Sequence, residues 1–64
     1  MEIFIEKDNR TLRKRFRGKA RNLLKDLKIS TETVIVVRNN ELVTEDETLT
    51  DNDRIKILSV ISGG

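Results

Sequence analysis

Apolar and polar residues alternate through the first quarter of the chain. In residues 1–7 one face carries Met1, Ile3 and Ile5, while the other is largely acidic. The alternation resumes over residues 10–17, where the apolar positions of one face are Leu12 and Phe16. A period of two is typical of a half-buried strand, and the Asp8-Asn9 pair between the runs favours a turn. The pattern predicts a first hairpin.

Gly18 ends the alternation, and the apolar spacing then changes to that of a helix. One stripe, spaced three and four residues apart, is formed by Ala20, Leu23, Leu24 and Leu27. This spacing predicts an amphipathic helix of about ten residues. Such a helix is too short to stand alone, so we expect it to lie across a sheet. Ser30 is a candidate cap in the segment that leads back.

The second half of the chain contains short apolar runs separated by turn signals. The β-branched run of residues 34–37 predicts a central strand covered by the helix. Asn39-Asn40 predicts a tight turn before a short return strand over residues 41–43. Leu49 is the one apolar anchor of a polar stretch, and a last strand is expected over residues 54–60 after a turn at residues 51–53.

The predicted order is ββαβββ. The first and last strands can lie side by side and parallel if a right-handed crossover joins them. The expected fold class is therefore α+β: a β-grasp roll with a mixed sheet and one helix packed across it. We expect a single domain over residues 1–60, followed by a tail over residues 61–64.

Composition narrows the function. The 64 residues contain no cysteine and no histidine, so disulfides, thiolate metal sites and imidazole acid/base catalysis are not expected. The sequence predicts no metal site, no bound cofactor and no catalytic residue. No apolar run approaches the roughly 20 residues of a membrane span. We expect a cytoplasmic protein that has no enzymatic activity and is monomeric when alone.

The tail is the strongest candidate for chemistry. It consists of Ile61, Ser62, Gly63 and Gly64. Two glycines without Cβ atoms form a thin peptide that would enter a narrow channel. The α-carboxylate of Gly64, ionised at neutral pH, is a nucleophile that would attack the α-phosphate of ATP in the site of a partner enzyme.

The strand pattern and this terminus together resemble a known family. The residues that carry the resemblance are the runs Val34 to Val43 and Leu49 to Ile57 and the ending Val60-Ile61-Ser62-Gly63-Gly64. They are similar to the ThiS/MoaD group of ubiquitin-like sulfur carriers. Where that family usually has glycine in two turns, this chain has Asn40 and Asn52, and asparagine tolerates positive φ.

The resemblance implies a function and a set of partners. A ubiquitin-activating-type adenylyltransferase would use ATP to adenylate Gly64, and a sulfurtransferase or other persulfide donor would convert it to a thiocarboxylate. A synthase would then accept the sulfur, for thiamin, molybdopterin or tRNA thiolation. The alternative within this group is a modifier joined through Gly64 to lysines of other proteins.

Two surfaces are candidates for partner binding. Phe4, Leu58 and Val60 lie on the faces opposite the expected core and form a predicted apolar docking patch for the activating enzyme. Residues 10–28 contain nine Lys and Arg against Asp26 alone, whereas residues 32–53 contain seven Asp and Glu against Arg38 alone. The basic half raises the alternative of a nucleic-acid-binding module. Two phenylalanines are the only aromatic residues, so a solvated basic face is favoured and direct nucleic-acid binding is not expected.

Overall fold

The fold of the protein was analysed in a computed structural model, which describes residues 1–60. The tail residues Ile61, Ser62, Gly63 and Gly64 lie outside the described residues. The strands are β1 (Glu2–Ile5), β2 (Arg10–Arg13), β3 (Gly18–Lys19), β4 (Val34–Arg38), β5 (Glu41–Val43), β6 (Thr48–Leu49) and β7 (Arg54–Ser59). A 3₁₀ turn, η1 (Glu6–Asp8), joins β1 to β2, and the helix is α1 (Ala20–Asp26).

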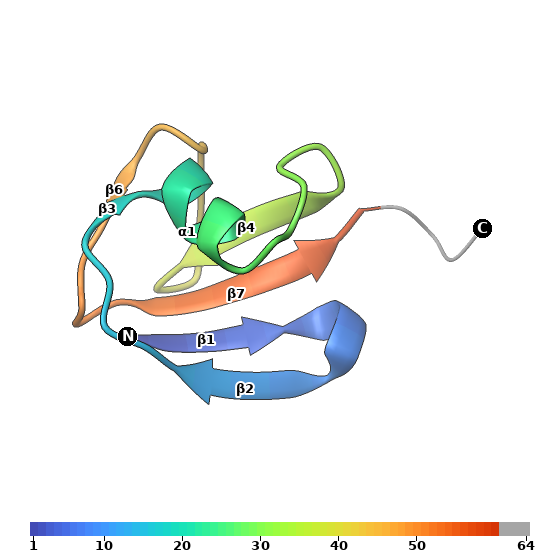
Figure 1. The fold of residues 1–64 in the computed structure, drawn as a ribbon, viewed down its shortest axis with the longest axis horizontal. Coiled ribbons are helices and arrows are strands. Elements are labelled where there is room, and N and C mark those ends of the chain that lie inside the picture. The colour runs from blue at the N-terminus through green and yellow to red at the C-terminus, as the bar shows by residue number, and fades with distance from the viewer. Residues whose placement is uncertain (61–64) are drawn as a thin grey trace.

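Five strands form one mixed sheet in the order β2-β1-β7-β4-β5, and α1 covers one of its faces (Figure 1). β1 and β7 run parallel, whereas β2, β4 and β5 pair antiparallel with their neighbours. The first and last strands are therefore adjacent, as the sequence predicts. The expected β-grasp roll, with one helix across a mixed sheet, is confirmed.

The core lies between α1 and the inner face of the sheet. Strand alternation explains its composition, since every second residue of β1 and β7 points inward. Its buried hydrophobic residues are Ile3, Ile5, Ala20, Leu23, Leu24, Val36, Leu49, Ile55 and Ile57. Leu49 has no exposed surface, which confirms its expected role as an anchor.

A two-stranded ladder, β3 with β6, was not predicted. It holds the acidic loop of residues 44–48 against the start of α1. The first two amides of α1 donate to this loop, Ala20 N–H to the Glu47 carbonyl and Arg21 N–H to the Glu45 carbonyl, each at 2.9 Å. Helix amides that have no partner within the helix are thus satisfied by loop carbonyls. The acidic run is a structural loop.

Several predicted elements are shorter than expected. The first strand ends at Ile5, before η1, and the last ends at Ser59. The second strand ends at Arg13, because its partner β1 begins at Glu2, directly opposite. Residues 14–17 keep the alternation of exposed and half-buried side chains but have no strand beside them. The helix ends at Asp26, where the expected pattern continued to Leu27 and Lys28, because Lys28 adopts a positive φ of 59°.

The turns use asparagine in one of the two expected places. Asn39 and Asn40 have φ values of 51° and 71°, which is the backbone of a type I′ hairpin turn. Asn52, in contrast, is not among the positive-φ residues of the described chain. The turn at residues 51–53 is instead held by the Asp53 carboxylate, which accepts from the Thr50 N–H at 2.9 Å and from the Asn39 side-chain amide at 3.0 Å.

Asp53 gives the fold a predicted pH dependence. Burial alone favours its neutral form, but the hydrogen bonds from Thr50 and Asn39 and the charge of Arg38 outweigh it and hold the pKa of Asp53 below its ordinary value of 3.8. A lowered folded-state pKa contributes stability above the unfolded pKa, which is lost as the pH falls through the folded value. Asp53→Asn should therefore lower the thermal midpoint at neutral pH, and the difference from the parent should shrink below about pH 4.

Thermal unfolding followed by circular dichroism between about pH 7 and pH 3 measures this difference. Asp8→Asn, in the exposed turn η1, is the matched control. A difference for Asp53→Asn that stays constant with pH would contradict the role of its charge.

Candidate functional site

The end of β7 positions the start of the tail. Ser59 is the last residue of β7 and Val60 is the last described residue; together they are called the tail root. The Val60 N–H donates to the Thr33 carbonyl at 3.0 Å, which extends the pairing with β4 by one bond. On the other side, the Ser59 N–H donates to Glu6 Oε1 at 3.0 Å. The tail root is thus held from both sides.

Glu6 replaces a missing strand partner. The parallel pairing of β1 with β7 ends at the Ile5–Ile57 pair, because η1 turns the chain away. The Glu6 side chain then supplies the acceptor that a longer β1 would have supplied from its backbone. This contact joins residues 53 positions apart in sequence, and alternation gives no sign of it. It is a functional candidate that sequence reasoning missed.

The predicted patch residues lie on the outer face of the sheet, opposite α1. Phe4 and Leu58 are half-buried, and Val60 is 47% exposed. Phe4 is level with Lys56 across the β1–β7 pair, so it lies diagonal to Leu58. Leu58 faces Ile35 directly across the β7–β4 pair. The alternation that places Leu58 on this face also places Val60 there.

The structure adds three apolar residues to this face. Ile35 is 39% exposed and Leu42 is 71% exposed, while Val37 is half-buried and pairs with Leu42 across β4 and β5. The run of residues 34–37 is thus covered by the helix on one face only, with Val36 buried and its neighbours outside. We call the following six residues the outer patch: Phe4, Ile35, Val37, Leu42, Leu58 and Val60.

The outer patch has one cation in its middle. Lys56 is exposed and lies between Phe4 on β1 and Val37 on β4 in the register of the sheet. No ion pair within residues 1–60 involves Lys56. The patch therefore presents apolar surface around a single ammonium group, beside the tail root.

The opposite side of the tail root carries a groove at the open end of the core. Its cavity volume is about 860 Å³, and its lining includes Leu27, Ile29, Val34 and Ser59. The polar groups on its rim are mixed in charge, with Glu6, Lys7 and Lys28 among them. The tail root therefore lies between this groove and the outer patch.

Residues 1–60 contain neither a metal-binding cluster nor a membrane-spanning helix. Within residues 1–60, no group of three or more His, Cys, Asp or Glu side chains is placed to hold a metal ion. No described helix is long and apolar enough to cross a membrane. The candidate functional site is the tail root together with the outer patch.

The mixed five-stranded sheet with one helix across it defines a class of protein, the small ubiquitin-like β-grasp domains. The sequence model of the ThiS family matches residues 5–64. The chain therefore belongs to the ThiS family, which confirms the resemblance described above.

Known proteins similar to this chain include a sulfur carrier and a solved structure. The sulfur carrier protein TtuB of Thermus thermophilus is 41% identical over 44 residues, which cover 69% of this chain and 68% of that protein. A solution structure of a thiamine biosynthesis protein from Geobacter metallireducens superposes with a TM-score of 0.61 and 25% sequence identity. That comparison covers 100% of this chain and 88% of the solved one.

The role of Glu6 leads to a prediction about local stability. Glu6→Ala should remove the acceptor of the Ser59 amide and raise its hydrogen-exchange rate by roughly threefold to tenfold, since one hydrogen bond contributes about 1 kcal/mol. The Val60 amide, bonded to Thr33, is the internal control and should change less. Amide exchange followed by NMR measures both rates, and unchanged exchange at Ser59 would contradict the contact.

Proposed function

We propose that the protein is a sulfur carrier whose reactive group is the carboxylate of Gly64. The observation that best supports this is the family match, which runs through residue 64 and so includes Gly63 and Gly64. The tail root supports it as well, because Ser59 and Val60 are held by hydrogen bonds on both sides at the C-terminal end of β7. The tail of residues 61–64 acts as an arm on the domain of residues 1–60.

Activation of Gly64 is a displacement at phosphorus. A carboxylate oxygen forms a bond to the α-phosphorus of ATP, and the bond to the β-phosphate oxygen breaks, releasing pyrophosphate. The product is an acyl-adenylate, a mixed anhydride whose carbonyl carbon is open to nucleophiles. The partner adenylyltransferase supplies the metal and the base for this step.

Sulfur is added in a second displacement. The terminal sulfur of a persulfide on the sulfurtransferase attacks the carbonyl carbon, and AMP leaves. A thiol then attacks the resulting acyl disulfide at the sulfur of the donor, so a disulfide forms on the donor side and the Gly64 thiocarboxylate is released. On the synthase the thiocarboxylate sulfur forms a bond to the acceptor substrate. Water then cleaves the bond between that sulfur and the Gly64 carbonyl carbon, which leaves the sulfur on the substrate and restores the carboxylate.

The carrier itself contributes no catalytic side chain. The sequence contains neither histidine nor cysteine, and the chemistry is performed by partner enzymes on the main-chain terminus. In this proposal the protein is a substrate of its partner enzymes. A group carrier needs a surface that its partner enzymes recognise and an arm long enough to enter their active sites. Four residues of fully extended chain would span roughly 13 Å.

The outer patch is the proposed docking surface for the adenylyltransferase. It adjoins the tail root through Leu58 and Val60, so a partner bound there would have its active site within reach of residue 64. Exposed apolar side chains grouped on a small domain mark a partner surface. Lys56 in the middle of the patch predicts an acidic side chain on the enzyme, opposite its ammonium group.

Removal of the last two residues is the first test of this function. A variant lacking Gly63 and Gly64 should lose ATP–pyrophosphate exchange with its adenylyltransferase by at least about a hundredfold, since small displacements of a reacting group have effects of that size. Ser62→Ala, which keeps the terminus, is the control. Exchange at the parent rate without the two glycines would contradict the proposal.

Charge introduced into the outer patch is the second test. Leu58→Asp should reduce kcat/KM for adenylation by about 30-fold, which corresponds to about 2 kcal/mol at an interface hot spot. Asn22→Asp, on the exposed side of α1, introduces the same charge elsewhere and should leave kcat/KM unchanged. Both variants should keep the circular dichroism spectrum of the parent. Full activity of a folded Leu58→Asp variant would show that the enzyme docks elsewhere.

A further inference from the structure

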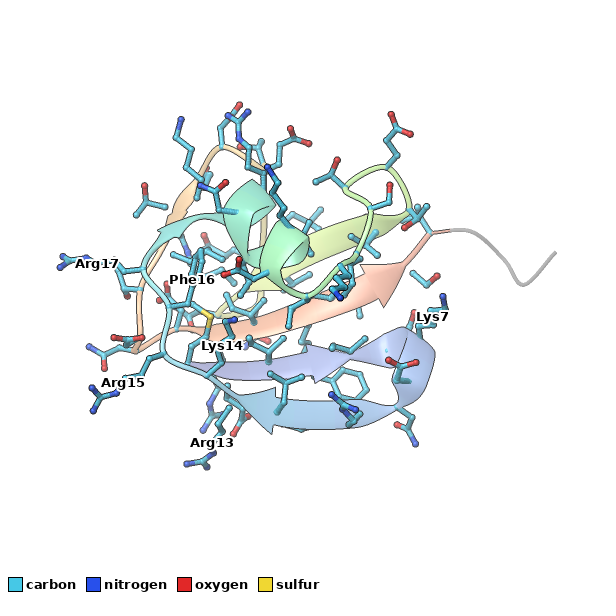
Figure 2. The ribbon with its side chains drawn as sticks, in the orientation of Figure 1. Lys7, Arg13, Lys14, Arg15, Phe16 and Arg17 are labelled. Atoms are coloured by element: carbon cyan, nitrogen blue, oxygen red, sulfur yellow. The ribbon has the colours of Figure 1, made fainter. Side chains whose placement is uncertain are left out.

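A second surface lies at the other end of the sheet. We call residues 13–17, Arg-Lys-Arg-Phe-Arg, the basic segment. Arg13, Arg15 and Arg17 are exposed, whereas Lys14 and Phe16 between them are half-buried. Figure 2 shows the three arginines projecting outward from one end of the molecule, with Phe16 turned over the body of the domain.

Two backbone amides of this segment donate hydrogen bonds to other parts of the chain. The Lys14 N–H donates to the Met1 carbonyl at 3.1 Å, and the Phe16 N–H donates to Asp51 Oδ1 at 2.6 Å. The Phe16 ring packs against the core. A Cβ on Gly18 would lie 3.3 Å from the Phe16 Cζ atom, so the absence of a side chain at Gly18 leaves room for the ring. The inward Phe16 fixes the outward direction of its two arginine neighbours.

The charges of the arginines are largely uncompensated. Within residues 1–60, no ion pair involves Arg15 or Arg17. Arg13 Nη2 lies 3.7 Å from Glu2 Oε1, but the Arg13 side chain is 85% exposed. The nearby Asp51 carboxylate accepts a hydrogen bond from the Phe16 N–H and pairs with none of the three arginines. Three acidic residues elsewhere are paired with other cations: Asp26 with Lys14, Asp46 with Arg21 and Glu47 with Arg38.

The scarcity of aromatic residues argues against binding through bases, but contacts to phosphates require no aromatic ring. Contrary to the expectation from the sequence, we propose that the basic segment binds the phosphate backbone of a nucleic acid. Alternate residues of an extended chain are about 6.6 Å apart, so the three arginines are spaced regularly along the segment, and each exposed side chain carries a forked guanidinium group. Each fork matches the oxygens of one phosphate. A strand with one charge per nucleotide presents the repeated anions that such a row requires.

The surroundings favour a nucleic acid over an acidic protein. Protein interfaces have an apolar centre, and the segment turns its one apolar side chain, Phe16, inward. Interfaces with nucleic acid are more polar and more positive. The inward Phe16 also leaves no ring for stacking on bases, so binding should be independent of sequence.

This surface is separate from the one used in sulfur transfer. Arg13 pairs with Glu2, and Glu2 pairs with Arg54 at the start of β7. The basic segment therefore begins beside the N-terminal end of β7, whereas the tail root follows its C-terminal end. The six residues of β7 span about 20 Å at roughly 3.3 Å per residue. The carrier would therefore hold a nucleic acid at one end while an enzyme engages the other. This inference goes beyond the proposed function and does not depend on it.

Fluorescence anisotropy with a labelled single-stranded RNA of about 15 nucleotides, and with DNA of the same sequence, tests the proposal at salt concentrations from about 50 to 300 mM. Three phosphate contacts predict that the logarithm of the binding constant falls against the logarithm of salt with a slope of about −2. The variant in which Arg13, Arg15 and Arg17 are all replaced by Gln should bind at least about tenfold more weakly at low salt, with a slope near zero. Arg15→Gln and Arg17→Gln alone should each weaken binding about threefold, and they serve if the triple variant does not fold.

A charge-matched control separates a specific surface from net charge. Replacement of Arg10, Lys25 and Lys28 by Gln removes the same three charges from other exposed positions and should change affinity by less than about threefold. Removal of Gly63 and Gly64 should leave RNA binding unchanged, so this test stands apart from that of Gly64. Equal weakening by both triple variants, absence of binding at about 50 mM salt, or equally tight binding of polyglutamate would each overturn the proposal.

Discussion

The parallel pairing of β1 with β7 is the interaction on which the rest of the structure depends. It places Ile3 beside Ile55 and Ile5 beside Ile57, and all four side chains are buried in the core. A chain of 64 residues buries only about 60% of its unfolded surface, and these two pairs supply four of the nine buried hydrophobic residues of the described core. The same pairing makes the last strand an interior strand of the sheet. β7 consequently reaches the tail root with a neighbour on each side, β4 through Thr33 and η1 through Glu6.

The sheet divides the molecule into parts with different uses. One face packs against α1 and forms the core, which leaves the other face to carry the outer patch. The acidic half of the chain supplies the loop that closes the start of α1, and its carboxylates pair with Arg21 and Arg38. The basic half keeps Arg15 and Arg17 outside any ion pair of the described chain. The acidic half of the sequence thus forms a structural loop, and the basic half forms a cationic surface.

Alternation and turn residues were enough to predict most of the fold. Ile3 and Ile55 follow from a period of two, Leu49 from its isolation among polar residues, and the hairpin at Asn39-Asn40 from residues that tolerate positive φ. Alternation shows which side chains are exposed but not which backbone groups have a strand partner. The predicted second strand therefore continues past Arg13 to residues that have no neighbouring strand.

The outer patch was only partly predictable for a related reason. A continuous β-branched run does not reveal which of its faces is covered, and Ile35 and Val37 become surface residues only through their register with Leu58 and Lys56. Leu42 depends in turn on its pairing with Val37. Glu6 could not be predicted, because its partner Ser59 is 53 positions away and the contact involves a side chain where a strand would use its backbone. Local sequence patterns do not reveal which residues of distant strands lie opposite each other, and these positions depend on that register.

The central claim is that an inert scaffold presents one reactive terminus, the carboxylate of Gly64. Intact mass spectrometry of the protein isolated from the cells that make it, with fragmentation to locate any change, tests this claim most directly. The account predicts a population in which one oxygen of Gly64 has been exchanged for sulfur. A chain found only as the unmodified acid, joined to lysines of other proteins, or continuing beyond Gly64 without processing would contradict it.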